Sequence, residues 1–527
     1  MAPRLTGAYR LCVGLAVALL LLVGASGPNA AMPDLAPRGW APGTLVPVTL
    51  GPGVVTGLLW TAYVIGGVAV LLGLRARVEA LRSWAVPLVL GGLTLLTAPF
   101  GSADHLNYLA YGRILVGGGD PWVEAPIDWA GGSDPVTSRV EEPWTTEPSV
   151  YGPFGTLLHG LSALVGGDSL RQGVWVWQVL VVMAWLGVRW LLRRVLDPQA
   201  HGRVDVLWTL NPLVFGVGVL GAHIDIVAAA LAVAAVGVVA VRPGLAGAAL
   251  GGGVVALAGS TKFTYGVVGV GIVVAWWVVG HRSGGLVRRL VALAGGFVVV
   301  AGVLHLWAGP HVYDQLGRSR QAVSLATPWR PLLEWARVSY GDAPTRYAIS
   351  VAAAVLAVVL AGCLLRLSRP AGPGTFSPDA GRFTFAPEQF PSEGGPSGAK
   401  NSPTPSDAVA PVALVAPVAL WVTACLSLAF SLAAPYSLPW YDLLVWAALP
   451  ALLPGLVDLV ALVRLTALAI AYVPGRVLGM TPAIEDLTLG VRRGVVPWVG
   501  LLLWVVVIVA GVRSGSVPRR APRRAGT

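Results

Sequence analysis

The residues best suited to chemistry gather in one polar stretch, residues 102–150, which holds eight of the chain's 25 acidic residues. Three tryptophans are interleaved with these acids. Aromatic rings stack on the CH groups of sugars, and carboxylates accept hydrogen bonds from sugar hydroxyls. The stretch therefore indicates a carbohydrate site. For four of the acids a solvated loop is the better explanation: Asp128, Asp134, Glu141 and Glu142.

Asp104 differs from the other acids because it directly follows an apolar run at about residues 84–101. A carboxylate held at the edge of a low-dielectric region can act as a general base. In a helix, the spacing of Asp104, Tyr108 and Tyr111 puts all three side chains on one face. The sequence thus predicts a base beside two aromatic rings.

A second candidate is Lys262, one of two lysines in the chain, which lies between two apolar runs. A cation in that position can meet a lipid phosphate. We expect it to face the short turn at residues 221–225, which contains His223 and Asp225. A His–Asp pair at such a turn is either part of the site or a structural hydrogen bond.

The stretch 309–346 carries five arginines, including Arg318 and Arg320. If this stretch lies outside the cell, the arginines run against the positive-inside tendency. Arginine binds phosphate through two parallel hydrogen bonds, so a phosphate held at the outer membrane face would explain them. The alternative is that a loop of this length contributes little to orientation.

The cysteines and histidines do not form a recognisable metal or disulfide pattern. Cys12, Cys363 and Cys425 all lie inside apolar runs, where cysteine is a small buried hydrophobe. No His, Cys or carboxylate spacing is typical of a dedicated metal site. We predict no cofactor and no obligatory metal, which leaves room for a divalent ion that bridges phosphate and carboxylate.

The composition identifies the scaffold that must position these residues. Of 527 residues, 55% are hydrophobic and 12% are charged, against roughly 25% charged in soluble proteins. Mean hydropathy is +0.73. These values exclude a soluble enzyme, a secreted disulfide scaffold and a disordered chain. The net charge of +11 comes from arginines at the ends of apolar runs, so it does not indicate a nucleic-acid partner.

We therefore predict an all-α polytopic membrane protein with about fourteen transmembrane helices. The first run, 11–27, is either a retained helix or a cleaved signal peptide, and retention leaves both termini in the cytoplasm. Residues 151–167, which open with Tyr151 and Pro153, are expected to form a helix on the membrane surface. The expected spans are 11–27, 54–74, 84–101, 172–192, 205–220, 224–241, 244–260, 264–280, 290–307, 347–367, 409–432, 442–462, 465–480 and 496–512.

The arginine-rich ends of these runs, among them Arg189 and Arg464, are placed on the inner side. Residues 368–408 are rich in Pro, Gly, Ser and Thr, and indicate a disordered cytoplasmic linker. The linker divides the chain into a transmembrane catalytic block, a second transmembrane block and a basic cytoplasmic tail. The transmembrane catalytic block is 1–367, with extracytoplasmic loops 102–150 and 309–346. The second transmembrane block is 409–512, and the basic tail is 513–527.

Several motifs, in order along residues 80–450, resemble the actinobacterial polyprenyl-phosphomannose-dependent α-1,6-mannosyltransferases, which are GT-C membrane glycosyltransferases. The motifs are 103–113 (ADHLNYLAYGR), 119–122 (GDPW), 148–153 (PSVYGP), 211–213 (NPL), 221–225 (GAHID) and 435–442 (PYSLPWYD). The family turn usually reads His-Asn-Asp, whereas this chain has His223-Ile224-Asp225.

The resemblance implies a GT-C-like bundle with a large extracytoplasmic loop and surface helices, and an active site on the outer face of the cell membrane. It implies that Asp104 is the base, that the donor is a sugar on polyprenyl monophosphate and that the acceptor is a lipid-linked mannan. Lys262, Arg318 and Arg320 are the expected phosphate ligands. The expected pocket residues are His105, Tyr108, Tyr111, Arg113, Asp120, Trp122, Tyr151, His223, Asp225, Trp440 and Tyr441.

A transporter or flippase of a lipid-linked sugar is the main alternative function. Transporters usually place their sites at the membrane midplane, on broken helices in repeated halves. We find no convincing internal repeat, and the polar residues cluster at one face. An arabinofuranosyl or glucosyl donor would need the same kinds of groups as mannose.

Overall fold

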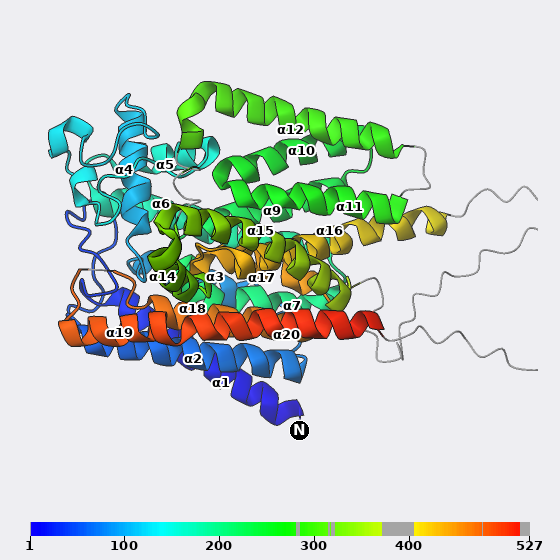
Figure 1. The fold of residues 1–527 in the computed structure, drawn as a ribbon, viewed down its shortest axis with the longest axis horizontal. Helices are drawn as coiled ribbons and strands as arrows, with labels where there is room; N and C mark the ends of the chain where they lie inside the picture. Colours follow the sequence, from blue (N-terminus) through cyan, green and yellow to red (C-terminus); the bar gives the residue numbers. More distant parts are fainter. Residues whose placement is uncertain are drawn as a thin grey trace, which may run out of the picture.

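The protein is described by a computed structural model that covers residues 2–280, 285–314, 317, 322–371, 405–476 and 478–516. Most helices lie along the long axis of one bundle (Figure 1). The first half contains α1 (Ala2–Ala25), α2 (Pro52–Ala76), α3 (Ala85–Leu96), α4 (Asp104–Val116), α5 (Pro153–Gly166), α6 (Leu170–Val195), α7 (His201–Val204), α8 (Pro212–Val214), α9 (Ile224–Val241) and α10 (Leu245–Thr261). The second half contains α11 (Val268–Gly280), α12 (Leu286–Ala308), α14 (Trp329–Tyr340), α15 (Asp342–Leu367), α16 (Pro405–Ala433), α17 (Leu443–Ala448), α18 (Leu456–Tyr472), α19 (Pro482–Gly494) and α20 (Val496–Ser516).

The prediction of an all-α polytopic membrane protein is confirmed. Within the described residues, nine helices are long and apolar enough to cross a membrane. Three shorter apolar helices, Ala85–Leu96, Leu245–Thr261 and Phe263–Val279, accompany them. The count of about fourteen spans stays a prediction, since length and composition support nine of them directly.

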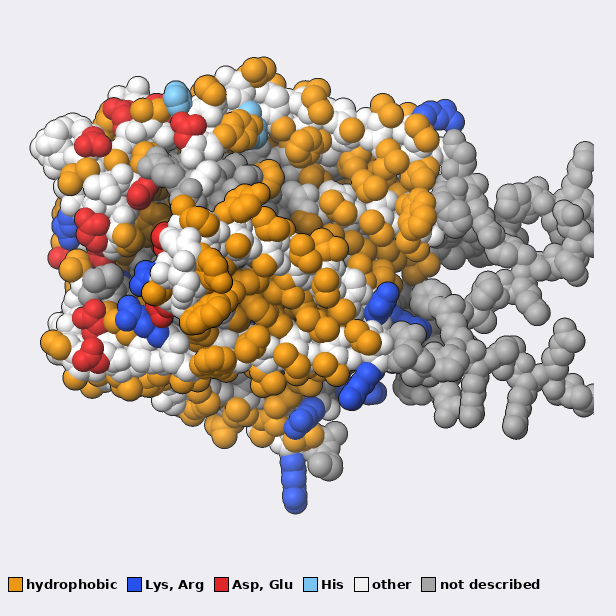
Figure 2. Space-filling model, in the orientation of Figure 1, with side chains coloured by type: hydrophobic (Ala, Val, Ile, Leu, Met, Phe, Trp, Pro, Cys, Tyr) orange, Lys and Arg blue, Asp and Glu red, His pale blue; other side chains and the backbone are white. Residues whose placement is uncertain are grey.

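The bundle has two chemically different ends. At one end, which we call the site end, α4 runs across the long axis beside the rest of residues 102–150 (Figure 1). On the face shown in Figure 2, acidic side chains gather at the site end together with some Lys and Arg, and a broad hydrophobic band separates this end from further Lys and Arg side chains toward the other end, the basic end. Such a band between two polar ends is what a bilayer requires of a spanning bundle.

The predicted spans at 442–462 and 465–480 have the wrong boundaries. The first region is a short helical segment, α17 followed by one 3₁₀ turn, that ends before Leu452. The second helix, α18, then runs from Leu456 to Tyr472. Pro450, Pro454 and Gly455 explain the break, because proline removes a backbone donor and glycine opens the turn.

A second break divides the predicted span 205–220. Two π-helical stretches, Asp205–Thr209 and Phe215–Leu220, flank the short helix α8. The side chain of Asn211 accepts a hydrogen bond from the Leu213 amide at 2.9 Å and so restarts the helix at Pro212. The candidate span that contains this break, Pro198–Leu220, is nevertheless the most completely buried of the nine. In its most apolar 18-residue window, 94% of the residues are buried inside the bundle.

The first residues of the predicted linker 368–408 are part of the folded bundle. Residues 368–371 are ordered, because the Ala371 amide donates to the Ala451 carbonyl at 2.8 Å and the Leu453 amide donates to the Arg369 carbonyl at 3.0 Å. The remainder of the predicted linker up to α16 lies outside the described residues, as do residues 517–527 of the predicted tail.

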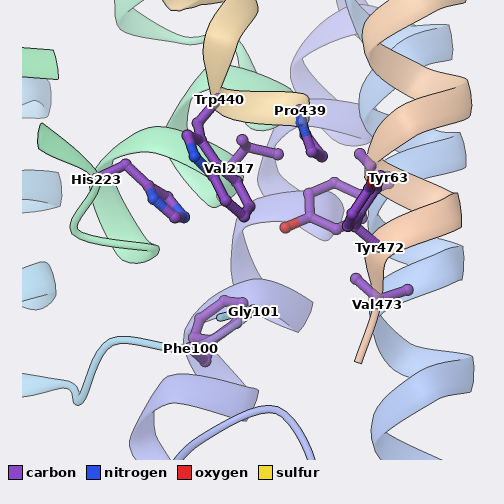
Figure 3. A pocket seen from close by; sticks show the side chains of 11 residues that line it. Tyr63, Phe100, Gly101, Val217, His223, Pro439, Trp440, Tyr472 and Val473 are labelled. Carbon is purple, nitrogen blue, oxygen red and sulfur yellow. The ribbon is translucent and has the colours of Figure 1, made fainter. Parts of the chain in front are cut away.

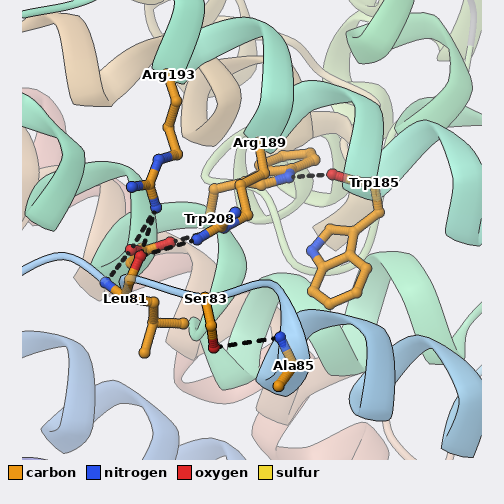
Figure 4. Close-up of polar contacts among 8 residues, drawn as sticks. Leu81, Ser83, Ala85, Trp185, Arg189, Arg193 and Trp208 are labelled. Atoms are coloured by element: carbon orange, nitrogen blue, oxygen red, sulfur yellow. Dashed lines mark hydrogen bonds and ion pairs between the residues drawn. The ribbon is translucent and has the colours of Figure 1, made fainter. Parts of the chain in front are cut away.

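A buried ion cluster fastens the basic end. Asp205 lies 3.0 Å from Arg189 and 3.4 Å from Arg193, and it also accepts the Leu81 amide at 2.8 Å (Figure 4). The guanidinium of Arg189 lies over the Trp84 ring at 4.4 Å. These contacts join the connection between α2 and α3 to α6 and to the broken segment, so charges that would be costly alone are paired.

Candidate active site

Asp104 is the first residue of α4, so the predicted base opens a helix as its motif suggested. Its amide donates to Ser102 Oγ at 3.3 Å, and its side chain is 14% exposed. Asp104 is therefore a partly accessible carboxylate in a fixed position.

His223 lies beside this carboxylate. Its Nδ1 is 3.4 Å from Asp104 Oδ2, and its Nε2 is 3.3 Å from Ser102 Oγ. The longer contact is electrostatic rather than a formed hydrogen bond, because Nδ1 has no hydrogen-bond partner within the described structure. Catalytic hydrogen bonds are often loose before substrate binds.

A third segment completes this part of the site. The Trp440 ring stacks on His223 with centroids 3.8 Å apart and planes 14° apart. Figure 3 shows the two rings side by side, with Tyr63 and Tyr472 across a small cavity. The cavity has a volume of about 20 Å³, enough for one water molecule and too small for a hexose. A sugar must therefore approach Asp104 from its exposed side.

Asp225 and Lys262 form a second unit beside the first. Lys262 Nζ lies 2.7 Å from Asp225 Oδ1, and Tyr265 donates to the same oxygen at 2.9 Å. The ammonium also lies over the Tyr441 ring at 3.8 Å. Lys262 faces the 221–225 turn as predicted. His223 and Asp225 do not pair with each other, because they project to different partners.

Tyr108, Tyr111 and Tyr151 form a packed aromatic wall between α4 and α5. The Tyr108 hydroxyl accepts a hydrogen bond from the Ile224 amide at 3.4 Å. The Tyr108 ring meets the Tyr151 ring edge-on, with centroids 5.1 Å apart. Tyr111 donates to the Glu147 carbonyl at 2.9 Å. Tyr108 thereby contacts the 221–225 turn; it and Tyr111 are buried, whereas Tyr151 is partly buried. They shape the site rather than offer an open stacking surface.

Two buried histidines lie within the same wall. His159 of α5 stacks on Tyr108 at 4.8 Å, and His105 of α4 is fully buried. Burial lowers the pKa of His105 and of His159 to about 3, so both imidazoles are neutral at physiological pH. The sequence placed His105 in the pocket and missed His159, whose helix looked like an ordinary surface segment.

Arg113 anchors the polar loop from the far end of α4. It lies 2.8 Å from Asp134 and also pairs with Asp168. The hydrogen bond that Arg113 donates to Asp134 raises the pKa of Arg113. Burial raises the pKa of Asp134, but hydrogen bonds from the Thr137 amide and Arg113 bring it below its ordinary value.

Two acids that the sequence assigned to a solvated loop are in fact buried partners. Asp134 is 7% exposed, and Glu141 is 10% exposed in an ion pair with Arg476. Arg476 also donates to the Asn29 carbonyl at 2.7 Å. The interpretation was wrong for both acids: Asp134 pairs with Arg113 of α4, and Glu141 pairs with Arg476, which is far away in sequence.

The remaining predicted pocket residues are structural neighbours of the wall. Asp120 accepts the Trp122 amide at 2.9 Å, which closes a tight turn. Trp122 donates from its indole to the Tyr151 carbonyl at 2.8 Å and meets Trp307 edge-on at 5.9 Å. Trp122 thus fixes the loop against Tyr151, which precedes α5, and against α12.

The predicted phosphate ligands Arg318 and Arg320 lie outside the described residues. Two other arginines of the same stretch have partners on their own helices: Arg330 pairs with Glu334 and Arg346 pairs with Asp342, each at 2.6 Å. Across the part of the chain that the structure describes, no three His, Cys, Asp or Glu side chains are grouped to hold a metal ion.

Comparison with known proteins decides the family. Residues 11–280 match a family model described as the N-terminal domain of α-(1→6)-mannopyranosyltransferases. The match covers more than half of the 527 residues. The chain belongs to the α-(1→6)-mannopyranosyltransferase family.

Individual relatives match over shorter stretches. A probable α-(1→6)-mannopyranosyltransferase of Mycolicibacterium smegmatis is 31% identical over 148 residues, 28% of this chain and 25% of the relative. α-(1→6)-Mannopyranosyltransferase A of Mycobacterium tuberculosis is 29% identical over 172 residues, 30% and 31% of the two chains. The enzyme of the same name from Corynebacterium glutamicum is 27% identical over 144 residues, 27% of each chain.

The chain therefore spans between a quarter and a third of the length of these mannopyranosyltransferases. No solved structure matches the chain. The family match includes Asp104, His223, Asp225 and Lys262, whereas Trp440 and Tyr441 lie beyond it. The structure brings these two later residues onto the matched part.

Proposed function

We propose that this mannopyranosyltransferase family member transfers mannose, with inversion, from polyprenyl-phosphate-mannose to a lipid-linked mannan. The product is an α-1,6 linkage, and the reaction takes place at the outer face of the cytoplasmic membrane. The arginine-rich basic end supports this orientation, since positive charge favours the cytoplasmic side. The site end then faces outward.

One observation carries the proposal: Asp104 and Lys262 both contact the turn at residues 221–225, at the same end of the bundle. Asp104 reaches His223, and Lys262 reaches Asp225. A general base and a phosphate-binding cation are thus held by one rigid turn. A transporter would need its polar groups along a path through the bundle.

In the proposed reaction, Asp104 accepts the proton of an acceptor hydroxyl. The oxygen attacks the anomeric carbon from the face opposite the phosphate, and the bond between that carbon and the phosphate oxygen breaks. A β-linked donor sugar becomes an α-linked product, and polyprenyl phosphate leaves with the electron pair. His223 supports the developing proton transfer through its contact with Asp104.

Lys262 stabilises the leaving phosphate. An ammonium has three N–H donors, of which one reaches Asp225, and the side chain of Lys262 is 18% exposed. The other donors can turn toward a phosphate oxygen as negative charge develops on it. Asp225 and Tyr441 hold the ammonium in place before the donor arrives. Arg318 and Arg320 stay predicted partners of the same phosphate.

The reaction class is tested with purified protein in lipid, polyprenyl-phosphate-linked radiolabelled mannose and a short α-1,6-mannoside acceptor. We expect transfer to the acceptor, and we expect NMR of the product to show a new α-1,6 linkage. Parallel reactions use arabinofuranosyl and glucosyl donors. Transfer from one of those donors instead would overturn the donor assignment. Movement of the intact donor across the bilayer without transfer would favour a flippase.

A further inference from the structure

The segment between α16 and α17, residues 434–442, carries two residues that touch the site. Trp440 stacks on His223, and Tyr441 lies under the Lys262 ammonium. Apart from one 3₁₀ turn, Pro439–Asp442, the segment is irregular. Its own backbone therefore does little to fix the two rings, and contacts from outside the segment must do so.

Arg464 supplies such contacts from the middle of α18. Its Nε lies 3.0 Å from Asp442 Oδ1, and its Nη2 donates to Ser437 Oγ at 2.6 Å. The Arg464 side chain is 8% exposed and that of Asp442 is 1% exposed. The sequence placed Arg464 at the inner side as a topology marker, whereas the structure shows it buried and paired within the bundle.

We propose that Arg464 is a positioning residue of the active site, which holds Trp440 against His223 and Tyr441 under Lys262. Arg464 grips the segment on both sides of the two rings, at Ser437 before them and at Asp442 after them. The planar guanidinium suits this role because its donors have fixed directions. The assignment rests on the proposed function for its effect on catalysis.

Further hydrogen bonds hold the backbone of the segment at Ser437, where Arg464 also binds. The Ser437 amide donates to Ser324 Oγ at 3.1 Å, and Tyr472 donates to the Ser437 carbonyl at 3.3 Å. Ser437 is thus held through its amide, its carbonyl and its hydroxyl. Removing the Arg464 side chain leaves the hydrogen bonds to the Ser437 backbone in place. It removes the ion pair that holds Asp442, so the end of the segment at Asp442 loses this contact.

The basic end offers a matched control on the same helix. Arg203 lies 2.9 Å from Asp458, near the start of α18, and the exposed fractions of the two side chains are 9% and 4%. This pair resembles Arg464–Asp442 in length and burial, but the contacts of Arg203 are with Asp458 and Leu449 and not with the segment 434–442. Loss of either pair should lower global stability similarly, whereas loss of the Arg464 pair alone should disturb the site.

The first experiment measures kcat for mannose transfer by Arg464→Met, Arg464→Lys, Ser437→Ala and Arg203→Met, each in lipid and at a temperature where it is folded. We expect Arg464→Met to lower kcat by about 100-fold, the effect of small misplacements at an active site. Arg464→Lys and Ser437→Ala, which keep part of the grip, should lose about 10-fold. Arg203→Met should stay within about twofold of wild type.

The second experiment follows hydrogen–deuterium exchange of the backbone amides at residues 436–442 and does not depend on catalysis. Exchange there should be faster in Arg464→Met than in Arg203→Met. If both variants lose equal activity and show equal exchange at 436–442, the positioning role is wrong. If the exchange differs as expected but even wild type transfers no mannose, Arg464 does position the segment and the proposed function is wrong.

Discussion

His223 lies flat against Trp440, with ring centroids 3.8 Å apart, although the two residues come from opposite halves of the chain. The same imidazole contacts Asp104 through its Nδ1 atom at 3.4 Å. Trp440 therefore restricts the ring that orients the proposed base. The site is assembled across the bundle, from the start of α4, the start of α9 and the segment before α17.

Replacing Trp440 by Leu should remove the stack and let His223 rotate. We expect kcat for mannose transfer to fall about 10-fold in Trp440→Leu and less in Trp440→Phe, since a second aromatic ring preserves a stacked contact. Initial rates at saturating donor and acceptor measure this. Trp335→Leu is the control, because Trp335 is 70% exposed on α14. Equal rates in Trp440→Leu and the control would contradict the orienting role.

Lys262→Met should weaken donor binding because the ammonium that meets the phosphate is lost. We expect the donor KM to rise about 10- to 100-fold, in line with a charge-assisted phosphate contact. The acceptor KM should change little. Asp225→Asn keeps the size of the side chain but loosens the ammonium, so its effect should be smaller and in the same direction. An unchanged donor KM in Lys262→Met would remove this lysine from the phosphate site.

The two neutral histidines predict an acid-sensitive fold. Because burial lowers the pKa of His105 and His159 to about 3, the unfolded chain binds more protons than the folded chain below about pH 6.5. Stability should therefore be fully present above pH 6.5 and fall toward pH 4, by up to about 1.4 kcal/mol per pH unit for each histidine.

Thermal unfolding in lipid across this pH range checks the sign. His159→Phe, which keeps a stacking ring, should flatten the acid limb, and the double variant with His105→Phe should flatten it further. His311→Gln is the control because His311 is exposed. A double variant with the same acid slope as wild type would show that these histidines are not the source.

The ion cluster at the basic end should matter for stability and not for catalysis. Asp205→Ala leaves the buried Arg189 without its partner, which we expect to cost about 3–5 kcal/mol. Chemical unfolding in detergent measures the loss, and Glu79→Gln on the exposed connection nearby is the control. Transfer activity per folded molecule should match wild type. Normal stability in Asp205→Ala would mean that the pairing contributes little.

The apolar runs predicted most spanning helices, because the length of an apolar run in the sequence shows directly whether a helix can cross the bilayer. The position of Asp104 was predictable for a similar reason: it follows an apolar run, and a helical spacing of aromatic residues begins there. Lys262 was predictable because a lysine between apolar runs is costly. Its position opposite the 221–225 turn followed from the order of the helices.

The partners of buried charges were not predictable from local pattern. Arg464 was assigned to the inner side by a rule that counts each arginine at the end of a run, yet it pairs with Asp442 inside the bundle. Glu141 was assigned to a solvated loop, yet its partner Arg476 follows α18, far along the chain. Long-range pairs of this kind leave no periodicity in the sequence. A buried Arg and a nearby Asp in neighbouring apolar runs would have been the available signal.

The central claim is that Asp104 is the catalytic base, and the most direct test compares Asp104→Asn with Asp128→Asn, an exposed acid of the same loop. Both variants are measured in lipid for binding of the polyprenyl-phosphate-mannose donor and for transfer of mannose to the α-1,6-mannoside acceptor. The account predicts that Asp104→Asn binds donor normally but loses at least about 100-fold in transfer, while Asp128→Asn matches wild type. Transfer by Asp104→Asn at the wild-type rate would contradict it.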